Sequence, residues 1–149
     1  MSIQQLIPNH LLKGLHADHL RLIDEAGKMI RISPHETVIH EDRPNQYIYL
    51  VVSGSVNVIL PDASGSTGVP LANLKPGDCF GEYSFVDHQP PNTRVLAAEP
   101  TELFQLRHSE LEALLESNPV IGQMIYRNLL THLVDRLRDS NAELEMFRV

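Results

Sequence analysis

The spacing of hydrophobic residues changes twice along the chain. In residues 9–26 leucine and isoleucine recur three or four positions apart, which is typical of amphipathic helix. Gly14 lies inside this region, so two short helices are expected rather than one. From Met29 the pattern becomes one of short β-branched and aromatic runs between turn residues. The strands it predicts are 37–39, 47–52, 56–60, 69–74, 93–98 and 102–106.

Helical spacing returns at the C-terminal end. Ser109 is the expected N-cap of a helix, with Glu110 and Glu112 favourably placed in its first turn. Asn118-Pro119 is expected to break this helix. Residues 120–149 contain no proline, and they read as one long final helix.

Short strands spaced about ten residues apart predict an all-β roll or barrel. We therefore expect a mostly β fold, a double-stranded β-helix (a jelly-roll-like β-roll) with helices at both ends. The length of 149 residues fits one domain over 1–149. Its expected parts are N-terminal helices in 1–28, the β-roll in 29–107 and C-terminal helices in 108–149.

The predicted final helix carries an apolar seam whose spacing alternates between four and three, the a/d pattern of a coiled coil. The seam extends past what one small roll could cover. We therefore expect a parallel homodimer through this helix, and the alternative is a helix packed only on its own roll. The seam consists of Tyr126, Leu130, Leu133, Leu137, Ser140, Leu144 and Phe147.

The charge and composition of the chain limit the kinds of partner and the location that we expect for it. The net charge of −7 disfavours direct binding to nucleic acid or to an anionic membrane, although a local pocket can still oppose it. Cys79 is the single cysteine, so one chain offers neither a disulfide nor a zinc-binding cysteine set. No signal peptide and no apolar run of membrane-spanning length is visible, so a cytoplasmic protein is expected.

Three segments, in order, resemble the cyclic-nucleotide-binding domain family, which includes catabolite activator proteins and protein kinase A regulatory subunits. Residues 49–56 read YLVVSGSV, similar to the family's strand ending in Ser-Gly-x-Val. Residues 74–82 read LKPGDCFGE, which looks like its Pro-Gly-Asp-x-Phe-Gly-Glu signature. The third is the closing pattern of 106–119 followed by a long helix. The resemblance implies a regulatory module, although the helix-turn-helix domain of catabolite activators is not expected here.

The resemblance also implies a ligand site. Backbone N–H groups after Gly81 can hold a phosphate, and Glu82 matches the family's ribose-binding glutamate. We therefore expect a small anionic ligand, with cyclic AMP or cyclic GMP as candidates and no bound cofactor. The expected ligand-binding residues are Gly81, Glu82, Tyr83, Ser84, Asn92, Thr93 and Arg94.

One departure from the family pattern weakens this expectation. Where nucleotide-binding members carry a phosphate-binding arginine and a small neighbour, this chain has Pro91 and Asn92. Arg94 lies three residues later. Strand alternation places it opposite Thr93 and Val95, unless a bulge turns it inward. Losing a bidentate arginine clamp weakens binding by roughly two to four powers of ten.

Two other functions remain open. The chain can be a ligand-free dimerisation or interaction module with a degenerate pocket. It can also be a cupin-like metalloenzyme, which would use a His-x-His pair and a glutamate as ligands. No His-x-His pair occurs, and His16 and His19 lack a second ligand pair. We therefore expect no metal site, no catalytic residues and no enzymatic activity.

Overall fold

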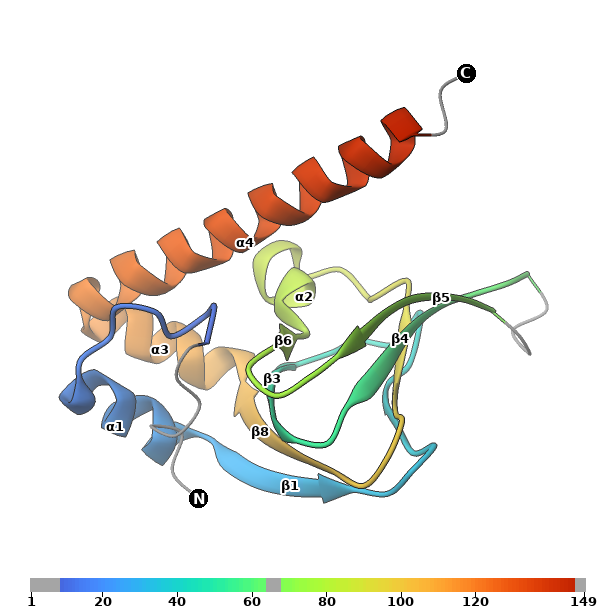
Figure 1. Cartoon of the computed structure of the whole chain (residues 1–149). Helices are drawn as coiled ribbons and strands as arrows, with labels where there is room; N and C mark the ends of the chain where they lie inside the picture. Colours follow the sequence, from blue (N-terminus) through green and yellow to red (C-terminus); the bar gives the residue numbers. More distant parts are fainter. Residues whose placement is uncertain (1–8, 64–67, 147–149) are drawn as a thin grey trace.

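The computed structural model describes residues 9–63 and 68–146. Helices gather at one end of a β-roll, and the last helix extends across it (Figure 1). The helices are α1 (Ala17–Ala26), α2 (Glu82–Asp87), α3 (His108–Ser117) and α4 (Pro119–Met146). The strands are β1 (Lys28–Ile32), β2 (Thr37–Ile39), β3 (Tyr47–Ser53), β4 (Val56–Pro61), β5 (Gly68–Leu74), β6 (Cys79–Phe80), β7 (Arg94–Ala97) and β8 (Thr101–Arg107).

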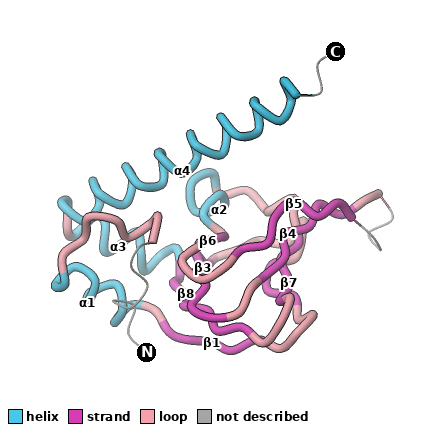
Figure 2. Tube along the Cα trace, viewed as in Figure 1, coloured by secondary structure: helices cyan, strands magenta, loops and turns pink. Residues whose placement is uncertain are grey.

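The strands form two four-stranded antiparallel sheets that face each other (Figure 2). The first sheet has the order β1-β8-β3-β6 and the second the order β2-β7-β4-β5. Apart from β4 and β5, neighbouring strands in the two sheets are not consecutive in sequence, so the chain crosses between the sheets, as a β-roll requires. The predicted fold class is therefore confirmed.

In the first sheet β3 is buried on both faces, and this explains why its sequence is an unbroken apolar run. Ile48 and Leu50 point to the helices, whereas Tyr49 and Val51 point between the sheets. Successive side chains of a strand alternate between faces, so a strand covered on both sides must be apolar at every position. The second sheet keeps only one buried face, and β7 accordingly alternates between half-buried and buried residues.

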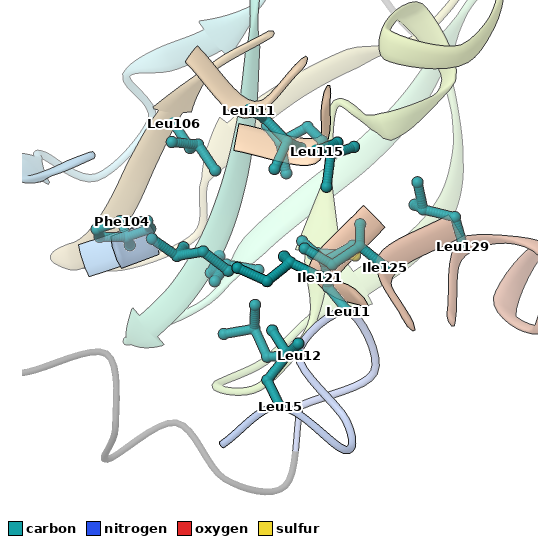
Figure 3. Packing of buried hydrophobic residues seen from close by; sticks show 14 of the residues in the cluster. Leu11, Leu12, Leu15, Phe104, Leu106, Leu111, Leu115, Ile121, Ile125 and Leu129 are labelled. Atoms are coloured by element: carbon teal, nitrogen blue, oxygen red, sulfur yellow. The ribbon is translucent and has the colours of Figure 1, made fainter. Parts of the chain in front are cut away.

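A second core lies between the first sheet and the helices (Figure 3). Ile121, Ile125 and Leu129 bring the first half of α4 into this core at spacings of four residues, one face of a helix. Leucines from α3, β8 and the N-terminal segment complete it. They include Leu106, Leu111, Leu115, Leu11, Leu12 and Leu15.

Two sequence predictions at helix ends are wrong. Within residues 9–27 the structure has one α-helix, α1, rather than two, because residues 10–14 form a turn that ends at Gly14 with a φ of +85°. Asn9 initiates that turn by accepting hydrogen bonds from the Leu11 and Leu12 N–H groups. Ser109 is not an N-cap, since α3 begins at His108 without a side-chain cap. The His108 N–H donates instead to the Gln46 carbonyl at 2.8 Å.

Within the described residues, no helix combines the length and apolar character needed to cross a membrane.

Candidate ligand-binding cavity

The glycine-rich turn before α2 sets the geometry of the candidate site. Gly81 has a φ of +87°, and a Cβ atom there would collide with the Tyr47 carbonyl oxygen. Only glycine fits such a position without strain. Glu82, the next residue, therefore lies at the start of α2 with its side chain turned inward. Glu82 is only 2% exposed.

A cavity of about 760 Å³ lies between α2, the second sheet, the segment 89–93 and α4. Six of the seven predicted ligand residues line it, namely Gly81, Glu82, Tyr83, Ser84, Asn92 and Thr93. Its opposite wall is apolar. That wall includes Ile39, Val58, Leu60, Leu71, Leu74 and Val95. The cavity thus joins a polar rim to an apolar wall, as small-molecule sites usually do.

Arg94, the seventh predicted residue, does not line the cavity. It lies on the other face of β7 from Val95, as strand alternation requires. Its guanidinium pairs with both carboxylate oxygens of Glu41, with Nε donating to Oε2 at 2.9 Å. This hydrogen bonding lowers the pKa of Glu41 to about 2. The pair ties the chain after β2 to β7 on the outer surface of the roll.

Pro91 and Asn92 line the cavity where the family arginine would be expected. Proline offers no N–H donor, and asparagine offers no charge. The Pro91 carbonyl accepts a hydrogen bond from the Asp42 N–H at 2.8 Å, which fixes this segment against the turn after β2. The side of the cavity near β7 therefore contributes no cation.

The cation that lines the cavity comes from α4. Arg136 Nη1 donates to the Tyr83 hydroxyl at 3.0 Å, and its guanidinium lies 5.9 Å from the centre of the Tyr83 ring. Asp139 and Ser140 line the cavity beside it. Figure 1 shows how α4 passes over α2 to bring these residues there. Among the described lining residues, Arg136 is the only lysine or arginine, and it faces the acids Glu82, Asp87 and Asp139.

Sequence reasoning missed Arg136. The available signal was the face of α4 that meets the roll, which is apolar at Ile121, Ile125 and Leu129. One further turn along, the same face carries His132 and then Arg136. The change from apolar to polar occurs where α4 leaves the core and passes over α2 and the cavity.

Glu82 is the buried charge of the site. Its burial raises the pKa of the carboxyl above the usual value, whereas hydrogen bonding to its own backbone N–H and the charge of Arg136 act in the opposite direction. His132 of α4 also approaches this carboxyl, with its Nε2 atom 3.8 Å from Glu82 Oε1. Two residues of α4 therefore face the carboxylate expected to bind a ribose.

The structure gives less support to a metal site or to chemistry at Cys79. Across residues 9–63 and 68–146, no group of three or more His, Cys, Asp and Glu side chains is arranged to hold a metal ion. Cys79 is a buried core residue, and burial raises the pKa of its thiol well above the usual range.

An inward-turned glutamate, an apolar wall and a helix over the cavity together place the chain in the class of β-roll domains with an internal cavity. The chain matches the family model of the cyclic nucleotide-binding domain over residues 29–118, which is more than half of its length. The chain therefore belongs to the cyclic nucleotide-binding domain family.

Individual relatives agree with this assignment. The chain is 31% identical over 145 residues to "Glutaminase 1" of Bradyrhizobium diazoefficiens, covering 95% of this chain and 22% of that protein. It is 32% identical to the "Cyclic AMP receptor protein" of Thermus thermophilus, covering 73% of this chain and 48% of that protein. A solved structure of the Thermus thermophilus catabolite activator protein superposes with a TM-score of 0.81 at 28% identity, covering 93% and 62% of the two chains. The chain thus spans less than half the length of these two curated relatives.

Proposed function

We propose that this chain is a regulatory ligand-sensing module that binds a cyclic nucleotide, or another small anionic ligand, in the cavity and signals through α4. One observation carries this proposal: Glu82 of α2 and Arg136 of α4 line the same cavity. A ligand that contacts both would bridge the β-roll and the helix. Its binding would then shift the equilibrium between two packings of α4.

The contacts available in the cavity suit a nucleotide. Glu82 provides carboxylate oxygens for ribose hydroxyls, and the apolar wall suits a base. Arg136 provides the positive charge that an anionic group needs. The Thermus thermophilus relative named as a cyclic AMP receptor supports cyclic AMP as the first ligand to test.

We expect cyclic AMP to bind weakly, because the arginine of the β7 side is replaced. Pro91 and Asn92 supply no charge, and Arg94 is engaged by Glu41. A bidentate clamp of two charge-assisted hydrogen bonds is worth roughly two to four powers of ten in affinity. Arg136 would recover only part of the lost affinity, since it also donates a hydrogen bond to the Tyr83 hydroxyl.

The proposed module acts as a homodimer through α4. Tyr126, Leu130 and Leu137 of the predicted seam are large apolar side chains exposed to solvent, with Leu130 64% exposed. Leu133, which also belongs to the predicted seam, is half-buried. The last seam residues, Leu144 and Phe147, lie outside the described side chains. A second copy would cover the exposed part of the seam.

A ligand-free interaction module is the second candidate function. The observation that favours it is the engagement of Arg94 by Glu41, which leaves the β7 side of the cavity without a cation. Such a module would keep the roll and the α4 seam, and it would bind no nucleotide.

Calorimetric titration with cyclic AMP and cyclic GMP separates the two candidates. We expect a saturable signal that is weakened at least tenfold in Glu82→Ala, because the ribose acceptor is removed. Arg94→Ala is the matched control, and its affinity should equal that of the wild type. The absence of binding at millimolar nucleotide would favour the ligand-free module. Submicromolar affinity that persists in Arg94→Ala and in Arg136→Ala would show that the phosphate site lies elsewhere.

A further inference from the structure

His132 occupies the junction between α4, α2 and the N-terminal segment. Its Nε2 atom is buried and has no hydrogen-bond partner, and it lies 3.8 Å from Glu82 Oε1, beyond hydrogen-bonding distance. The His10 ring packs beside it, with 5.5 Å between the ring centres. A polar atom that is buried without a partner costs free energy, so its retention here needs a reason.

Burial and the neighbouring Arg136 and His10 favour the neutral ring of His132. Burial lowers the pKa of His132, and Arg136 and His10 lower it further. Asp78, from the turn before β6, and Asp135, on α4, act in the opposite direction. The Glu82 carboxylate faces the ring from α2. While His132 is neutral, the ionised form of Glu82 is therefore opposed mainly by Arg136.

This arrangement is unfavourable for an anionic ligand. The described residues that line the cavity include three carboxylates and one arginine. An anion that enters beside Glu82 adds a further negative charge to this set. One extra positive charge next to Glu82 would offset the repulsion, and His132 is the adjacent group able to supply it.

We propose that the cavity takes up an anionic ligand together with one proton, and that His132 accepts this proton from solvent at Nε2. The inference rests on the proposed function, since it assumes that an anion binds beside Glu82. His132 acts through Glu82 as a positioning residue. Once protonated, it forms an ion pair with the Glu82 carboxylate and holds α4 against α2 while the ligand is bound.

Linkage fixes the direction of the effect. A nearby anion favours the protonated imidazole, so ligand binding raises the pKa of His132 toward the experimental pH. By reciprocity, protonation of His132 increases the affinity for the anion by the same factor. For one linked proton the affinity changes by at most about tenfold per pH unit. An uncharged ligand in the same cavity lacks this coupling.

The test measures the affinities of cyclic AMP and of adenosine, its uncharged counterpart, between about pH 8 and about pH 6. For the wild type we expect cyclic AMP to bind roughly three- to tenfold more tightly at the lower pH, while adenosine binding stays constant. In His132→Gln the affinity for cyclic AMP should lose this dependence. His16→Gln is the matched control, because His16 is an exposed histidine at the start of α1, and it should behave as the wild type.

Proton uptake provides a second measurement that needs no variant. Calorimetry of the wild type near pH 6.5, in two buffers of different ionisation enthalpy, should show net uptake of a fraction of a proton with cyclic AMP and none with adenosine. A pH dependence that persists in both His132→Gln and His132→Asn would overturn the proposal. Loss of the pH dependence in His10→Gln would also overturn the proposal, because the proton would then reside on His10. If the wild type binds neither ligand at any pH, the proposed function itself fails.

Discussion

The two halves of α4 meet the rest of the molecule in different ways. In the first half, Ile121, Ile125 and Leu129 are almost fully buried in the helical core. In the second half, the face toward the roll carries His132 and Arg136, which contact Glu82 and Tyr83. One continuous helix therefore passes from an apolar core to a polar junction over the cavity.

Under the proposed function, the first half of α4 is an anchor and the second half is a sensor. Apolar packing in the first half resists displacement, because removing a buried side chain exposes its surface or leaves a cavity. The contacts of the second half are few and polar, so a ligand can replace them at little cost. Segments that move in response to ligands generally come from such regions of low local stability. We expect the second half of α4 to respond to ligand while the first half stays fixed.

The largest expected effect comes from the anchored half. Ile125→Ala should lower the free energy of unfolding by about 2–4 kcal/mol, since Ile125 of α4 is fully buried in the core between the helices and the first sheet. Urea denaturation measures the difference. Val120→Ala, at an exposed position of the same helix, should change it by less than about 0.5 kcal/mol. Equal effects of the two substitutions would mean that α4 is not anchored through this face.

A smaller effect is expected at the outer seam. Leu137→Asp places a charge in the apolar surface that a second copy would cover, so it should weaken dimerisation by two to three powers of ten, on the order of 3–4 kcal/mol. Analytical ultracentrifugation measures the dissociation constant. Thr131→Glu, exposed on another face of α4, is the control and should leave the dimer intact. A wild-type chain that sediments as a monomer at micromolar concentration would rule out the seam as an interface.

The smallest effect concerns the buried carboxyl of the polar junction. Burial raises the pKa of Glu82, so between the unfolded value of 4.5 and the raised value the folded state binds more protons than the unfolded state. The contribution of Glu82 to the free energy of unfolding of the wild type therefore falls as the pH rises through that window. Glu82→Gln cannot lose a proton, so its melting temperature should rise relative to that of the wild type as the pH increases from 4.5 through the raised pKa of Glu82. A difference that is constant with pH, or one shared by the exposed control Glu116→Gln, would contradict this reasoning.

The fold was predictable because its signals are local. Alternating apolar residues, turn residues and the Gly77 and Gly81 positions each act over a few neighbours, and together they specify the roll. The position of Arg94 also followed from alternation along one strand. The role of α4 over the cavity did not, because Arg136 and His132 lie far along the chain from Glu82. Only the packing of α4 on the helical core decides which of its residues reach α2.

Hydrogen–deuterium exchange along α4 tests the central claim most directly. With cyclic AMP added to the saturation point of the titration, peptides covering 131–142 should exchange more slowly than in the free protein. Peptides covering 119–129 should exchange at an unchanged rate, because that half is held by the core in both states. A uniform change along the whole helix, or a change confined to 119–129, would contradict the division of α4 into an anchor and a sensor.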